Sequence, residues 1–145
     1  MTEANGERVT DNPELLYEDL EPGRTFEPMT FAITPGLVAD YRAAVADDRP
    51  PLTAGARTLA PAGLWGIWGR QAYLQHHRMP GGGILAGQDM EYHSPAYVGD
   101  VLLVQATVAA RFERKERPYA TIESTAHNEA GELCGVVRVT AIWPK

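Results

Sequence analysis

The segment ADDRPPLT, residues 46–53, places two carboxylates, an arginine and two prolines directly after a stretch with helical spacing. A carboxylate held in a loop can orient or activate a water molecule. Acids and prolines are also ordinary residues at the end of a helix, because proline cannot continue it. The segment is therefore a candidate for the floor of an active site or, alternatively, a simple helix stop.

The other candidate bases are the four histidines. His76 and His77 end a helical stretch, where the helix dipole or surface exposure accounts for them. His93 follows Tyr92 on an expected strand, so the two side chains point to opposite faces and His93 points away if Tyr92 packs on the helix. His127 borders an expected turn. Histidine and carboxylate residues show no metal-ligand spacing, so we expect no metal site.

The bulk composition limits the possible classes of protein. A chain of 145 residues, 44% apolar and with net charge −6, fits one acidic globular domain. It has no apolar run of the roughly 20 residues that cross a bilayer, and its polar, acidic beginning does not resemble a signal peptide. The single cysteine, Cys134, excludes a disulfide framework and fits a small buried residue better than a nucleophile. We therefore expect a soluble cytoplasmic protein.

One basic cluster stands out, formed by Arg111, Arg114, Lys115 and Arg117. Acidic residues interrupt it, whereas a nucleic-acid-binding protein normally shows a continuous basic stripe. A solvated turn between two strands explains the cluster, and a contact for the phosphate of a cofactor-like carrier is the alternative. We expect neither a nucleic acid nor a membrane as partner.

The first half of the chain predicts one strand and one short helix. Residues 1–16 are expected to be a flexible lead-in to a domain at 17–145. Residues 24–33 have strand composition, interrupted or placed at an edge by Pro28. Thr34 and Pro35 form a helix start for residues 35–46, in which the apolar spacing is carried by Leu37, Val38, Tyr41 and Val45.

A second, largely buried helix is predicted over residues 60–77. The predicted apolar face contains Leu64, Ile67, Trp68, Gln71 and Ala72, flanked by Trp65 and Tyr73. Its three glycines at 63, 66 and 69 each weaken a helix by roughly 1 kcal/mol relative to alanine. Glycines in such positions indicate that another element approaches the helix backbone closely.

Four strands with short turns complete the chain, at residues 84–93, 101–112, 119–127 and 133–143, the last two joined by a hairpin turn that contains Gly131. One long helix against a curved antiparallel sheet is the α+β layout of the hot-dog fold. Such a sheet leaves edges and faces uncovered, so we expect a dimer formed through the sheet.

Three stretches resemble one family, the MaoC-like hydratases and dehydratases. Residues 17–26 (YEDLEPGRTF) resemble its opening Y-x-D-L-x-x-G-x-x-F, residues 92–100 (YHSPAYVGD) its F-x-x-P-x-x-x-G-D strand and turn, and residues 128–133 its last hairpin. The start of the long helix at 59–61 and the segment 87–92 are most similar to the FAS1-type N-terminal dehydratase branch. The chain is also similar to the substrate-holding subunits of heterodimeric 3-hydroxyacyl-ACP dehydratases.

The resemblance implies site residues in the segment ADDRPPLT. Active members carry D-x-N-P-x-H there, and the Asp and His hold the water that adds to a 2-enoyl thioester or leaves in the reverse direction. Asp48 matches the Asp, Pro50 replaces the Asn, Pro51 matches the Pro, and Thr53 stands at the His position. A threonine hydroxyl cannot act as a base near neutral pH, but it can position a water molecule.

The family also uses a glycine amide near the start of the long helix to stabilise charge on the thioester oxygen. The alignment puts Pro61, which has no N–H, or Ala62 at that place, with Gly63 just beyond. Ala62 and Gly63 are therefore the candidate substrate contacts. Trp65 and Trp68 are core or interface residues in one interpretation and line an acyl tunnel in the other.

Two main hypotheses follow from the resemblance. The first is an (R)-specific enoyl-thioester hydratase or 3-hydroxyacyl-thioester dehydratase, acting on an acyl chain bound to CoA or an acyl carrier protein through Asp48 and Thr53, without a cofactor. The second is a non-catalytic acyl-binding subunit beside an active MaoC-like partner. A hot-dog protein recruited for another biosynthetic reaction is a third possibility, because common folds host several chemistries.

Overall fold

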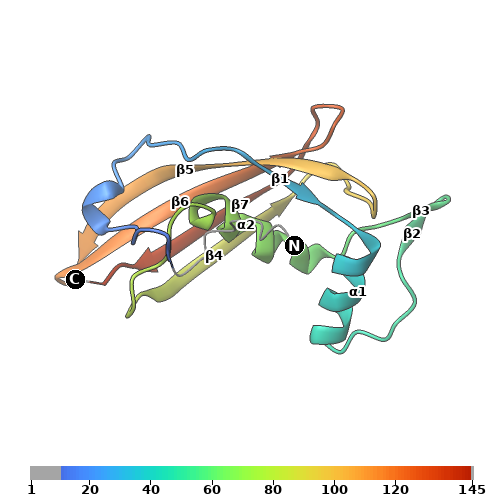
Figure 1. Cartoon of the computed structure of the whole chain (residues 1–145), viewed down its shortest axis with the longest axis horizontal. Coiled ribbons are helices and arrows are strands. Elements are labelled where there is room, and N and C mark those ends of the chain that lie inside the picture. The colour runs from blue at the N-terminus through green and yellow to red at the C-terminus, as the bar shows by residue number, and fades with distance from the viewer. Residues whose placement is uncertain (1–10, 145) are drawn as a thin grey trace, which may run out of the picture.

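The sheet that organises the molecule has five antiparallel strands in the order β1-β5-β6-β7-β4 (Figure 1). The structure is a computed structural model that describes residues 11–144. The strands are β1 (Met29–Ala32), β4 (Ile84–Tyr92), β5 (Val101–Arg114), β6 (Arg117–His127) and β7 (Leu133–Ile142). Helix α2 (Trp65–Leu74) lies against one face of this sheet. This arrangement is the single hot-dog domain that the sequence predicts.

Alternation along the strands explains why one face of the sheet receives the helix. In β5 the side chains of Leu102, Val104, Ala106 and Val108 are fully or almost fully buried, while residues between them are more exposed. Successive side chains of a strand point to opposite faces, so this pattern gives one apolar face. That face and the buried side of α2 together form the core.

Helix α2 is shorter than the predicted span 60–77. A 3-10 turn, η3 (Ala62–Leu64), precedes it, and the helix ends at Leu74. Its buried face also differs from the prediction, because Gln71 is exposed and Ile67 is only partly buried. The buried residues of this segment are Leu64, Trp65, Trp68, Gly69, Ala72 and Tyr73. The two tryptophans therefore define the core side of the helix.

Gly69 is the point where the helix backbone comes closest to the sheet. A Cβ atom at this position would lie 2.5 Å from a methyl carbon of Val137 on β7. The buried hydroxyl of Ser124 on β6 donates a hydrogen bond of 3.0 Å to the Gly69 carbonyl. The close approach expected from the glycines of this helix is confirmed here.

Helix α1 (Pro35–Ala44) begins as predicted. The hydroxyl of Thr34 accepts a hydrogen bond of 3.0 Å from the Leu37 N–H, and Pro35 occupies the first turn. The strand expected at 24–33 is limited to β1, with a single bridge between Thr25 and Thr107 before it. The interruption at Pro28 and the edge position of β1 agree with the prediction.

The packed domain starts earlier than residue 17. Residues 1–10 of the expected flexible lead-in lie outside the described residues, but Leu15 is fully buried. Its N–H donates to the Arg78 carbonyl at 2.9 Å, and the Trp143 indole donates to the Leu15 carbonyl at 2.8 Å. The segment before the 3-10 turn η2 (Tyr17–Asp19) is thus fixed on the domain.

A small hairpin that the sequence analysis missed connects α1 with α2. Strands β2 (Thr53–Ala54) and β3 (Arg57–Thr58) project at the same end of the molecule as α1 (Figure 1). Arg57 anchors the hairpin, with its guanidinium 2.6 Å from a carboxylate oxygen of Asp100 and 3.9 Å from the ring centre of Tyr97. Each strand has only two residues, too few to give a period-2 pattern.

The basic cluster lies at the opposite end of the molecule, around the turn between β5 and β6. Lys115 and Glu116 form this two-residue turn with φ values of 51° and 63°. Arg111 instead packs toward the chain start, with its guanidinium 5.2 Å from the ring centre of Tyr17. The predicted turn between two strands is confirmed.

Candidate functional site

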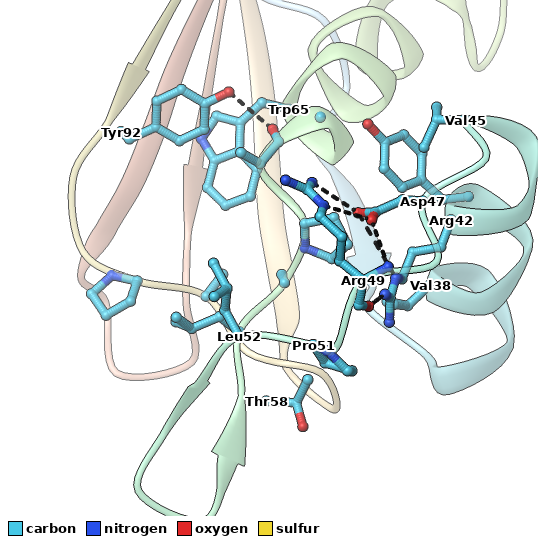
Figure 2. A pocket seen from close by; sticks show the side chains of 18 of the residues that line it. Val38, Arg42, Val45, Asp47, Arg49, Pro51, Leu52, Thr58, Trp65 and Tyr92 are labelled. Atoms are coloured by element: carbon cyan, nitrogen blue, oxygen red, sulfur yellow. Dashed lines mark hydrogen bonds and ion pairs between the residues drawn. The ribbon is translucent and has the colours of Figure 1, made fainter.

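A groove of about 840 Å³ opens beside the start of the long helix. Its walls are the loop after α1 (residues 45–52), the segment 58–63 that leads into α2, and residues 92–96 after β4. Tyr41 from α1, Trp65 from α2 and Cys134 from β7 also line it. The groove thus brings together segments that are far apart in the sequence (Figure 2).

Asp47 holds the loop after α1 in place. Its carboxylate accepts hydrogen bonds from the Arg49 guanidinium at 2.9 Å and from the Arg49 N–H at 3.2 Å (Figure 2). The Arg42 guanidinium lies 4.0 Å away and donates to the Arg49 carbonyl. The hydrogen bonds from Arg49 lower the pKa of Asp47 to about 2. Asp47 is therefore a fixed anion at neutral pH and a poor base.

The two residues assigned to catalysis by the resemblance are not brought to the same place. Asp48 is exposed and lines the groove, and it forms no ion pair within the described part of the chain. Thr53 is exposed at the first position of β2 and is not among the residues that line the groove. Of the two positions that the family motif pairs, only Asp48 therefore lines the groove.

The helix start resolves which backbone groups face the groove. Pro61 is the N-cap of η3, so Ala62 and Gly63 carry the first N–H groups of the helical segment. The first N–H groups of a helix have no partner within it. Both residues line the groove, and they are free to offer N–H donors to a ligand there.

An aromatic wall closes the groove next to the helix start. The rings of Trp65 and Tyr92 lie 5.1 Å apart, and the Tyr92 hydroxyl donates to the Ala62 carbonyl at 2.9 Å (Figure 2). Trp68 is fully buried behind Trp65, with ring centres 5.8 Å apart, and does not line the groove. Of the two tryptophans considered as substrate contacts, the structure brings only Trp65 to the site.

Tyr41 is a groove residue that the sequence analysis treated only as part of an apolar helix face. Its hydroxyl packs against the Cα of Gly63, where an added Cβ atom would lie 1.7 Å from the hydroxyl oxygen. Tyr41 is partly buried against the core. A glycine at the start of a helix was the one sequence signal that a side chain from elsewhere approaches this point.

The histidines do not complete a pair with Asp48. His76 forms an ion pair of 2.9 Å with Glu27, and the ring of His77 lies 6.1 Å from that of Phe26. Both follow the C-terminal end of α2, about 15 Å along the helix from the groove. Burial, with the nearby Arg24, lowers the pKa of His77. His93 is exposed and borders the groove at the end of β4.

Cys134 and the acidic groups add no further chemistry to the site. Burial raises the pKa of the Cys134 thiol, which therefore stays protonated at neutral pH. Among residues 11–144, no group of three or more histidine, cysteine, aspartate or glutamate side chains is placed to hold a metal ion. Within the same range, no helix has both the length and the apolar character needed to span a membrane.

Known proteins resemble this chain in fold rather than in sequence. No protein-family model and no curated protein matches the sequence. The solved structures include the unliganded R-hydratase PhaJ1 from Pseudomonas aeruginosa, with a TM-score of 0.75 and 20% identity over 91% of this chain and 87% of that chain.

Two further structures share the arrangement. The HadBC 3R-hydroxyacyl-ACP dehydratase complex from Mycobacterium tuberculosis has a TM-score of 0.72 and 20% identity over 83% of this chain and 96% of that chain. A MaoC-like dehydratase from Rhodospirillum rubrum has a TM-score of 0.70 and 19% identity over 90% and 98%. The hot-dog fold, and the resemblance to MaoC-like proteins at the level of the fold, are confirmed.

Proposed function

We propose that this chain belongs to the MaoC-like hydratase and dehydratase family and binds an acyl thioester in the groove. The (R)-specific reaction adds water across the double bond of a trans-2-enoyl thioester, or removes water from a 3-hydroxyacyl thioester, with CoA or an acyl carrier protein as the carrier. The observation that supports this most strongly is that one groove joins the loop containing Asp48 to the N–H groups of Ala62 and Gly63.

The chemistry assigns a separate task to each wall. During hydration the water oxygen bonds to C3 of the enoyl chain and a proton is added at C2. Asp48 orients or activates the water. The N–H groups of Ala62 and Gly63 stabilise the negative charge that develops on the thioester oxygen. Thr53 lies outside the groove, so the proposed reaction in a single chain depends on Asp48 without its expected companion.

The position of Thr53 favours a second candidate function. In it, the chain holds the acyl group while an active MaoC-like partner supplies a complete Asp/His pair. The HadBC structure is a complex of two chains, which makes this kind of assembly a precedent on the same fold. No cofactor is needed in either case.

An uncovered strand supports a dimer in both cases. Strand β4 ends the sheet, and eight of its nine residues are exposed, Met90 alone being partly buried. An exposed edge strand presents unpaired N–H and C=O groups that can pair with another chain. A second copy of this chain, or a related chain, is proposed to cover it.

Loss of enoyl-thioester absorbance tests the proposed function. The purified chain is mixed with a short-chain and a medium-chain 2-enoyl-CoA, beside the variants Asp48→Asn and Thr53→His. Turnover that Asp48→Asn abolishes supports a self-sufficient hydratase. Binding without turnover, restored by a MaoC-like partner chain, supports the acyl-holding subunit. If the chain neither binds nor converts these thioesters, the proposal is contradicted.

A further inference from the structure

We propose that Tyr41 contacts the substrate and donates a hydrogen bond to the thioester oxygen. This inference rests on the proposed function and adds a residue that the family motif does not contain. It concerns stabilisation of charge on the thioester, and it leaves the activation of water to Asp48.

The position of the Tyr41 hydroxyl is the first observation that supports this role. Helix α1 directs this side chain into the groove, where its hydroxyl lies against the Cα of Gly63. Gly63 is one of the two residues that carry the first N–H groups of the long helix. The hydroxyl therefore lies directly beside one of the two residues that carry these N–H groups.

The second observation is the difference in hydrogen bonding between Tyr41 and its neighbour Tyr92. A phenol has one proton to donate. Tyr92 donates its proton to the Ala62 carbonyl at 2.9 Å. Tyr41 has no hydrogen-bond partner within the described part of the chain. The proton of Tyr41 is therefore available to a ligand, whereas that of Tyr92 is already used.

Gly63 is required for this arrangement. A Cβ atom at position 63 would lie 1.7 Å from the Tyr41 hydroxyl oxygen and 2.6 Å from its ring carbon Cζ. Separations below 3.0 Å force one of the groups to move. Alanine at position 63 would thus push the Tyr41 hydroxyl away while keeping its backbone N–H.

The chemistry of a phenol fits a donor at this place. A phenol O–H is an uncharged hydrogen-bond donor with one proton to give. The hydrogen bond from a fixed donor becomes stronger when negative charge develops on the acceptor oxygen in the transition state. Removing one such donor typically lowers kcat by about 100- to 1000-fold. Tyr41 cannot replace the base of the missing histidine, so its predicted effect is on charge stabilisation alone.

Kinetics with a 2-enoyl-CoA give the first test. We expect Tyr41→Phe to lower kcat by about 100-fold, with a much smaller change in KM. Gly63→Ala should have a similar effect, and the double variant should be no worse than the more damaging single variant, because both changes remove one interaction. Tyr119→Phe removes the same hydroxyl from a ring stacked on Phe112, away from the groove, and should match the wild type.

A spectroscopic measurement keeps the proposal testable if the chain binds without turnover. Acetoacetyl-CoA absorbs differently as a ketone and as an enolate, and a donor to the thioester oxygen favours the enolate. The wild type and Tyr119→Phe should raise the enolate fraction of the bound thioester, and Tyr41→Phe should lose this increase.

The outcomes separate the two proposals. If the wild type binds or converts the thioesters and Tyr41→Phe matches it within about twofold in both measurements, the role of Tyr41 is overturned and the proposed function stands. If the wild type binds neither the enoyl-CoA nor acetoacetyl-CoA, the proposed function fails, and the role of Tyr41 falls with it.

Discussion

Neighbouring carboxylates in one loop have different environments. Asp47 is engaged by two arginines, whereas its neighbour Asp48 faces the groove without an ion pair in the described chain. A carboxylate held by Arg49 stays ionised and fixes the loop. Asp48 is left as the acid that can meet a ligand. The segment ADDRPPLT is therefore both a helix stop and a wall of the groove.

The pKa of Asp47 predicts a pH-dependent contribution to stability. Its folded pKa of about 2 lies below the ordinary value of about 3.9. A depressed pKa stabilises the folded state above the unfolded value, and this contribution is lost as the pH falls through the folded value. Asp47→Asn should lower the melting temperature near pH 7, and its difference from the wild type should vanish as the pH falls from about 4 to about 2.

Asp48→Asn is the matched control for this measurement, because it removes a neighbouring charge that has no ion-pair partner in the described chain. It should leave the melting temperature unchanged across the same range. A constant difference between Asp47→Asn and the wild type at all pH values would contradict the role of the Arg49 contact.

Single residues also show where the sequence could predict the site and where it could not. Asp48, Ala62 and Gly63 line the groove, and the resemblance places them on the loop and at the helix start; Trp65, which the helical pattern places on the long helix, lines it as well. Thr53, in contrast, is not among the groove residues. The loop after the two prolines leads into β2, and Thr53 is the first residue of that strand. No local pattern in the sequence reports such a path.

At the scale of elements, the sequence predicts the long strands β4 to β7 closely, and the long helix and the first strand less well. Strands β5, β6 and β7 end at clear turns, so their predicted bounds lie within two residues of those in the structure. The predicted span 60–77 extends beyond both ends of α2, because its first residues form the 3-10 turn η3 and its last three, Gln75, His76 and His77, are polar residues that follow the helix. The buried face also differs. The prediction places Ile67 and Gln71 in the core, whereas the sheet packs against Gly69 and the two tryptophans.

Gly69 provides the test at this scale. Alanine normally gains roughly 1 kcal/mol over glycine inside a helix. At position 69, however, its Cβ would lie 2.5 Å from Val137, and overpacking of this kind costs about 1–3 kcal/mol. We expect Gly69→Ala to lower the free energy of unfolding measured with denaturant.

Two further variants identify the cause. Gly36→Ala changes a glycine of α1 that has open space around it, so it should leave the stability unchanged or raise it. Val137→Ala removes the obstructing methyl groups, and combined with Gly69→Ala it should cost less than the sum of the two single changes. Strict additivity would show that the contact with β7 is not the reason for the glycine.

At the scale of the whole molecule, strand β4 ends the sheet with an uncovered edge, opposite to the edge formed by β1. Leu85 on β4 is 58% exposed and its neighbour Ile84 is 51% exposed, and an exposed apolar edge strand favours pairing with another chain. The sequence predicts a dimer from the general problem of open edges, and we propose that a partner covers β4, the edge strand with eight exposed residues.

A charge on this edge should separate the partners. We expect the wild type to sediment as a dimer of the 15.8 kDa chain, and Leu85→Lys to shift it toward the monomer, because a lysine on an edge strand opposes pairing. Leu103→Lys is the matched control: Leu103 is 52% exposed but lies on β5, between β1 and β6. It should remain dimeric. A dimer unaffected by Leu85→Lys would place the interface elsewhere, and a wild type that is monomeric alone would favour a heterodimer with a second chain.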